Sequence, residues 1–149
     1  MNKPRAIDND ILLGEICLHL SQGKKVKLRA KGSSMWPFIH GDEDTLLLTP
    51  VSTLSKGDIV LAYIDGKKYV VHRIVDLNEN TITLMGDGNL YEKETCTRSD
   101  IYGAVDSIIR DGEELSLISK KAHMQARIWR LLLPLRRLKA KISYKFNHI

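Results

Sequence analysis

No apolar run in this 149-residue sequence is long enough to cross a membrane. A membrane-spanning helix needs about 20 mainly apolar residues, whereas the apolar segment 11–20 is short and contains Glu15 and His19. The first ten residues combine Lys3 and Arg5 with two aspartates and lead into no apolar core with a small-residue cleavage site, so we expect no secretory signal peptide. These absences predict a cytoplasmic protein that does not span a bilayer.

Cysteine is scarce, and acidic residues are missing from the end of the chain. Cys17 and Cys96 have no metal-ligand or redox spacing, so we assign them no role, and nothing else in the sequence predicts a metal ion or an organic cofactor. Residues 1–119 contain 14 basic and 18 acidic side chains, whereas residues 120–149 contain nine basic and no acidic ones. This asymmetry predicts an anionic partner for the tail and not for the body.

The length and the hydrophobic pattern predict one domain with an extension at each end. The N-terminal extension, residues 1–24, contains a predicted amphipathic helix over Asp8–Leu20, which Asp8 or Asn9 can cap and Gly23 can end. We expect this helix to cover a sheet.

Residues 25–119 have the alternating pattern of a small all-β domain. Two Asp-Gly pairs, Asp65-Gly66 and Asp111-Gly112, predict tight hairpins, because this pair tolerates the positive φ angles of such turns. The predicted strands are Val26–Ala30, Thr45–Leu48, Asp58–Ile64, Lys68–Asp76, Thr81–Met85, Tyr102–Arg110 and Leu115–Ile118.

Residues 120–149 return to helical spacing, and Pro134 should kink or split the helix. A basic amphipathic helix of this kind is attracted to an anionic membrane surface, which would place the protein at the cytoplasmic face of a membrane. The alternative is that the apolar stripe packs on the body; we expect no nucleic acid, because the sequence has no aromatic ladder and no helix-turn-helix before the tail. The stripe consists of Ile128, Leu131, Leu132, Leu135, Leu138 and Ile142, with Arg127, Arg130, Arg137 and Lys141 largely opposite.

Three segments carry polar groups that a plain β domain does not need. After Gly32 the chain turns through Ser33 and Ser34 before Pro37 ends regular structure, which presents a serine hydroxyl on a constrained loop. Serine is a weak nucleophile unless a neighbouring base takes its proton. Taken alone, this segment is also compatible with an ordinary serine-rich turn.

The other two segments contain groups that could activate such a serine. His72 shares a strand face with Val70 and Ile74, and histidine is the side chain best matched to general-base chemistry near pH 7. Asp87 lies in a Gly-Asp-Gly turn and could orient the imidazole. Alone, the histidine could be a core residue and the aspartate merely part of a turn.

In this order, the segments resemble the LexA/signal-peptidase superfamily of serine endopeptidases over Val26–Val105. Residues 32–37 match the G-x-S-M-x-P box around the nucleophile, and residues 56–60 resemble the K-G-D-I-V strand entry. Residues 72–74 look like the H-R-I box of archaeal and endoplasmic-reticulum signal peptidases, in which histidine replaces the lysine base, and residues 86–89 are similar to the G-D-N box.

The resemblance implies a mainly β fold of coiled antiparallel sheets and endopeptidase activity toward peptides with small side chains before the scissile bond. It makes Ser34 the nucleophile, His72 the general base and Asp87 the orienting carboxylate. The residues expected to bind substrate are Gly32, Ser33, Met35 and Pro37. Gly32 stands where signal peptidases have an oxyanion-stabilising serine, so we expect the Ser34 N–H as one oxyanion donor and Ser33 or another group as the second.

The sequence therefore predicts a Ser-His-Asp endopeptidase that processes a precursor protein or peptide through an acyl-enzyme. The membrane-spanning segment typical of signal peptidases is missing. A LexA-like self-cleaving regulator is one alternative, although the 33 residues before Ser34 leave little room for a DNA-binding domain and a linker. A catalytically silent binding module of the same fold is the other, because Gly32 departs from the signal-peptidase pattern.

Overall fold

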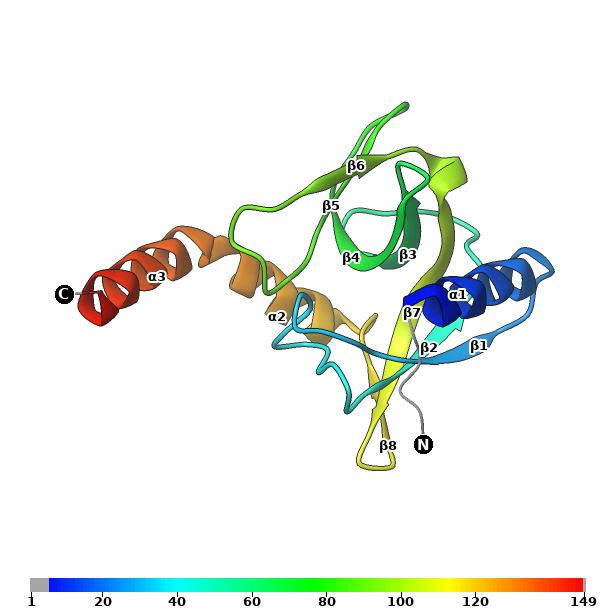
Figure 1. Ribbon diagram of the computed structural model, residues 1–149, viewed down its shortest axis with the longest axis horizontal. Helices are drawn as coiled ribbons and strands as arrows, with labels where there is room; N and C mark the ends of the chain where they lie inside the picture. The colour runs from blue at the N-terminus through cyan, green and yellow to red at the C-terminus, as the bar shows by residue number, and fades with distance from the viewer. Residues whose placement is uncertain (1–5, 149) are drawn as a thin grey trace.

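The protein is mainly β, with a curled antiparallel sheet that forms a half-barrel (Figure 1). A computed structural model describes residues 6–148. The strand order is β1-β2-β7-β3-β4-β5-β6, with β8 paired to β7, and every neighbouring pair is antiparallel. The strands are β1 (Val26–Arg29), β2 (Thr45–Thr49), β3 (Ile59–Ile64), β4 (Lys68–Leu77), β5 (Ile82–Met85), β6 (Glu94–Cys96), β7 (Ile101–Arg110) and β8 (Glu113–Ser116).

The predicted fold class is confirmed, with two local differences. All seven predicted strands occur, but the last begins at Glu113, two residues before the predicted Leu115. The strand β6 and the short 3-10 helix η1 (Arg98–Asp100) were not predicted, because each has only three residues. Both Asp-Gly hairpins form, and all four of their residues have positive φ angles between 53° and 78°, as the tight turns require.

The helix α1 (Ala6–Ser21) begins before its predicted start, so Asp8 and Asn9 lie within the helix, after its N-cap position. Its C-terminus is as predicted. Gly23 has a φ of 83°, its N–H donates to the Leu20 carbonyl, and the Lys24 N–H donates to the His19 carbonyl. This is the Schellman arrangement, in which glycine takes the left-handed position after a helix.

Two hydrophobic clusters make up the core. The first lies between α1 and the sheet, where Leu20 packs so closely on β7 that a Cβ on Gly103 would lie 2.8 Å from it. The second is centred on β3, β4 and β5 and contains Val60, Ile74 and Leu84. Because β3 and β4 belong to both clusters, the middle of the sheet is held on both faces.

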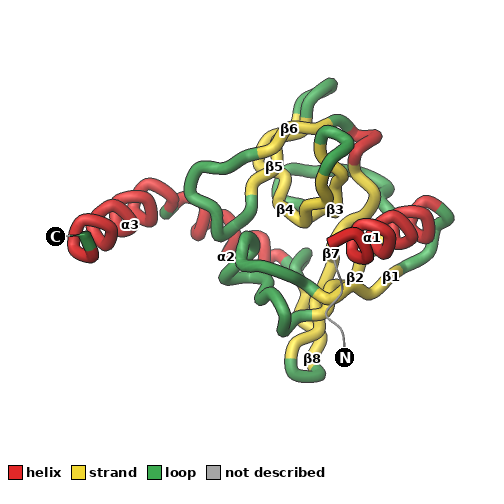
Figure 2. Tube along the Cα trace, in the orientation of Figure 1, coloured by secondary structure: helices red, strands yellow, loops and turns green. Residues whose placement is uncertain are grey.

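The predicted basic tail forms two helices, α2 (Lys120–Leu131) and α3 (Leu133–Asn147). They separate at Leu132, two residues before Pro134, which confirms the predicted split. Figure 2 shows the strands gathered in the body, with α3 extending away from them. Within residues 6–148, no helix has both the length and the hydrophobicity that crossing a membrane would require.

Candidate active site

The loop between β1 and β2 carries Ser34 and is closed at its base by backbone contacts. The Ala30 N–H donates to the Asp44 carbonyl (2.9 Å), and the Asp42 N–H donates to the Ala30 carbonyl (2.8 Å). Gly41 lies against this junction, and a Cβ there would overlap the backbone of Gly32. The two ends of the loop are therefore fixed to each other before any side chain contributes.

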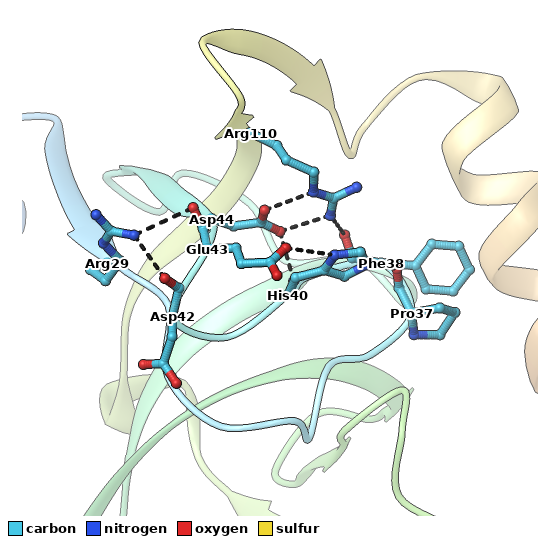
Figure 3. Close-up of polar contacts among 8 residues, drawn as sticks. All are labelled: Arg29, Pro37, Phe38, His40, Asp42, Glu43, Asp44 and Arg110. Carbon is cyan, nitrogen blue, oxygen red and sulfur yellow. Dashed lines mark hydrogen bonds and ion pairs between the residues drawn. The ribbon is translucent and has the colours of Figure 1, made fainter.

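A buried ion pair fixes the same loop to β7 (Figure 3). Arg110 donates two hydrogen bonds of 2.7 and 2.8 Å to Asp44, which is fully buried and also accepts the His40 N–H. Burial by itself would raise the pKa of Asp44, but the hydrogen bonds and charge of Arg110, together with the His40 N–H, hold that pKa below its ordinary value. Arg110 also donates to the Phe38 carbonyl (3.3 Å), so one guanidinium supports two points of the loop.

Ser34 and His72 are brought together as predicted. Met35 anchors the loop by its buried side chain, and the preceding Ser34 hydroxyl lies 3.2 Å from Nε2 of His72. His72 comes from β4, opposite Val60 of β3, and is only 6% exposed. The hydroxyl is therefore within hydrogen-bonding reach of an imidazole whose position is set by a central strand.

The other ring nitrogen of His72 contacts Glu94, which the sequence analysis did not identify. Nδ1 of His72 lies 3.0 Å from Oε2 of Glu94, and both side chains are more than nine-tenths buried. Glu94 pairs with Leu84 across the sheet, and Leu84 pairs with Ile74, so Glu94 shares its sheet face with Ile74 and His72. In the sequence, Glu94 is one acidic residue among several. Its strand has only three residues, too few for an alternating pattern to reveal it.

The expectation that Asp87 contacts His72 is wrong in this geometry. Asp87 accepts hydrogen bonds of 2.8 and 2.7 Å from Arg73, which also donates to the Gly57 carbonyl (2.8 Å). Arg73 follows His72 in β4, so the two side chains project to opposite faces of the sheet. A carboxylate on the face of Arg73 cannot reach the imidazole, and Asp87 instead neutralises a guanidinium that is 5% exposed.

The turn that carries Asp87 nevertheless packs on the nucleophile loop. The Gly88 N–H donates to the Ser34 carbonyl (2.8 Å), and the Asp87 N–H lies 3.4 Å from the sulfur of Met35. A Cβ on Gly86 would overlap the Ser34 carbonyl oxygen and would lie 3.1 Å from Nε2 of His72. The Gly-Asp-Gly sequence therefore allows a close approach that side chains would prevent.

A largely apolar groove of about 810 Å³ opens beside Ser34 and His72. Its walls come from α1, the segment 26–31 that includes β1, and the part of β4 that ends at His72. Of the residues expected to bind substrate, Gly32 and Met35 line the groove. Ser33 and Pro37 are not part of its wall; Ser33 is exposed, and the Pro37 carbonyl is 3.1 Å from Nε2 of His40.

Neither cysteine contributes to this constellation. Burial raises the pKa of Cys17 to about 11, and burial with the nearby charges of Asp100 and Glu94 raises the pKa of Cys96 to about 11. Both thiols are therefore protonated near neutral pH and poorly reactive.

The family model described as Peptidase S24-like matches residues 5–106. No curated protein matches the chain. The matched segment contains Ser34, His72 and Glu94, and it ends within β7.

Proposed function

The chain belongs to the Peptidase S24-like family, and we propose that it is a serine endopeptidase in which Ser34, His72 and Glu94 act together. The contact that carries the proposal is the buried series from the Ser34 hydroxyl to Nε2 of His72 and from Nδ1 to the Glu94 carboxylate, at 3.2 and 3.0 Å. A nucleophile, a base and an orienting carboxylate in this order are what acyl transfer by serine needs.

In the proposed mechanism, Oγ of Ser34 attacks the carbonyl carbon of a peptide bond while Nε2 of His72 takes the hydroxyl proton. Glu94 accepts a hydrogen bond from Nδ1–H of His72 and stabilises the imidazolium. His72 then gives the proton to the leaving amine, and the acyl group remains on Ser34. Water, deprotonated by His72, releases the acid and restores the serine.

The negative charge that develops on the substrate oxygen needs hydrogen-bond donors from the nucleophile loop. We propose the backbone N–H of Ser34 as one of them. The Gly88 N–H holds the Ser34 carbonyl, and the Asp44–Arg110 pair fixes the loop base. A donor held by such contacts needs little reorganisation during the reaction, which is where electrostatic catalysis gains most.

The groove supports a peptide as the substrate. The strand β1 is at the end of the strand order, so within the part of the chain that the structure describes one of its edges has no partner strand. An extended peptide could pair with that edge and place its carbonyl at Ser34, with apolar side chains along the groove. We propose small side chains immediately before the scissile bond and a processed protein or peptide as the physiological substrate.

The proposal is tested by incubating the protein with a diverse peptide library and identifying the products by mass spectrometry. Wild type should generate new termini that follow small residues, and the Ser34→Ala protein should generate none. A matched peptide pair with alanine or phenylalanine before the bond then tests the side-chain preference.

Two outcomes would contradict the proposal. Identical products from wild type and Ser34→Ala would assign the cleavage to something other than Ser34, and an absence of products from folded wild type would favour a silent binding module. Intact mass is measured in parallel, because loss of mass in wild type but not in Ser34→Ala would make the chain itself the substrate.

A further inference from the structure

The helices α2 and α3 contact the body at the turn that packs on the nucleophile loop. Nε1 of Trp129 donates to the Asp87 carbonyl (2.7 Å), and Nη1 of Arg136 donates to the same oxygen (3.2 Å). Nε of Arg137 donates to the Leu90 carbonyl (2.7 Å). Arg137, expected on the solvent side of the tail, is therefore part of its attachment to the body.

Ring contacts join the two tail helices to each other and to the body. The guanidinium of Arg136 lies over the Trp129 ring, 4.1 Å from its centroid, and that of Arg137 lies 4.6 Å from the centroid of Tyr91. Trp36 of the nucleophile loop meets Trp129 edge to face, with 6.2 Å between ring centroids. We call residues 129–137 the elbow, because they join the two tail helices and fix them to the site.

The apolar stripe of the tail points away from these contacts. By the helical repeat, Ile128 and Leu131 lie opposite Ala126 within α2, and Leu135 lies opposite Arg137 within α3. The structure agrees, since Ala126 is 7% exposed while Leu131 is 72% and Leu135 62% exposed. The tail is therefore attached to the body, but not through its apolar stripe. This arrangement excludes the alternative in which the stripe packs on the body.

The charge of the tail determines what could cover this stripe. Residues 120–149 contain nine basic and no acidic side chains, and Arg127, Lys141 and Lys145 are exposed. A second copy docking through the same face would bring two such basic surfaces together, which is unfavourable. Nucleic acid would neutralise the basic side chains, but it would leave the leucines and isoleucines in contact with phosphate and water.

A bilayer rich in acidic lipid matches both properties at once, since cations meet the headgroups while leucine and isoleucine side chains enter the headgroup boundary. We propose that the exposed face of α2 and α3 docks on an anionic lipid bilayer. The elbow then holds the groove at a fixed position relative to that surface. Docking itself does not depend on the proposed peptidase activity, and only the placement of the groove rests on it.

The proposal is tested by sedimentation of the full chain with vesicles of phosphatidylcholine alone or mixed with phosphatidylglycerol. Wild type should bind the mixed vesicles and not the neutral ones, with weaker binding at high salt. The double change Leu131→Glu and Leu135→Glu should weaken binding at least about tenfold, because it places two carboxylates on the exposed stripe that would enter the headgroup boundary. Lys141→Gln with Lys145→Gln should weaken it roughly tenfold through lost attraction.

Matched controls separate docking from general effects of charge, folding and activity. Leu18→Glu introduces the same chemistry at a leucine that is 57% exposed on α1, and it should retain binding. Thermal unfolding of each variant should match wild type, because all the changed side chains are exposed. Ser34→Ala should bind vesicles as wild type does, so a failure of docking and a failure of the peptidase proposal are distinguishable.

Three results would overturn the proposal. Equal partition of wild type and the Leu131→Glu/Leu135→Glu protein would remove the stripe from the interaction. A concentration-dependent dimer that the same variant dissociates, without vesicle binding, would assign the stripe to a second copy. Binding to duplex DNA by a protein that ignores anionic vesicles would assign the tail to nucleic acid.

Discussion

Replacing Glu94 by glutamine should reduce kcat strongly while leaving the fold nearly intact. The carboxylate contacts Nδ1 of His72 at 3.0 Å and shares its sheet face, so its charge is available to the imidazolium that forms during attack. Glutamine keeps the size of the side chain but removes the charge, and its amide group can favour the wrong tautomer of the imidazole.

The size of the effect follows from this role. Losing the orienting carboxylate of a serine triad reduces turnover by about 100- to 10,000-fold, or roughly 3–5 kcal/mol of transition-state stabilisation. In the resting protein the glutamine oxygen can still accept the N–H of the imidazole, so we expect the free energy of unfolding to fall by only about 1 kcal/mol.

Asp87→Asn should show the opposite pattern and is the matched comparison. It leaves the guanidinium of Arg73, which is 5% exposed, without its anionic partner, and breaking a buried ion pair costs about 3–5 kcal/mol of stability. At a temperature where the variant remains folded, kcat should fall far less than in Glu94→Gln, because Asp87 does not touch the imidazole.

The assay compares kcat on one cleaved peptide with the free energy of unfolding from urea titration, for both variants and wild type. A Glu94→Gln protein with wild-type kcat would refute the role of Glu94. An Asp87→Asn protein that is fully stable but inactive would restore the aspartate to the reaction.

Three further predictions concern other parts of the site. Ser34→Ala and His72→Ala should each abolish peptide cleavage. The double variant should lose scarcely more activity than either single one, because the effects of residues that act as a unit do not add. Additive losses in kcat/KM would contradict the proposal that the two residues act together. Asp44→Asn should lower stability at pH 7 by about 3 kcal/mol, as measured by urea titration, because it leaves Arg110 without its buried partner. The pKa of Asp44 in the folded protein is below its unfolded value of about 3.9. Wild type should therefore have this stabilisation above about pH 3.9 and lose it as the pH falls through the folded pKa. If the stability of Asp44→Asn fell with acid as much as that of wild type, the stabilising role of the Asp44 carboxylate would be contradicted. Gly86→Ala should displace the nucleophile loop and reduce kcat at least about tenfold, because its Cβ would overlap the Ser34 carbonyl oxygen. An unchanged kcat would contradict this expectation and show that the turn can move aside.

Part of the site was predictable because its chemistry is encoded in local sequence. Ser34 lies in a box whose glycine and proline fix a turn, and His72 lies in a ten-residue strand rich in valine, isoleucine and tyrosine, which favour strands. Their contact required only that this strand pass beside the loop. The hairpin at Asp65-Gly66 was equally local, since two residues determine the turn.

Glu94 and Asp87 were misjudged because their roles depend on sheet faces and not on adjacent residues. Asp87 is in a conspicuous glycine turn, but its position relative to β4 selects Arg73 and not His72. Glu94 lies in a three-residue strand that exists only because β5 gives it a partner. Assigning the third member of the site from sequence would have required the register of three strands, which alternation within each strand does not supply.

The position of Arg110 also determines where this protein can be truncated for expression. The family match ends at residue 106, in the middle of β7 (Ile101–Arg110), so a fragment trimmed to that boundary would lose the guanidinium that neutralises fully buried Asp44. The chain must continue through the elbow to keep the donors to the Asp87 carbonyl. A smallest workable fragment therefore ends after Arg137, and a purification tag is better attached beyond α3 than in place of it.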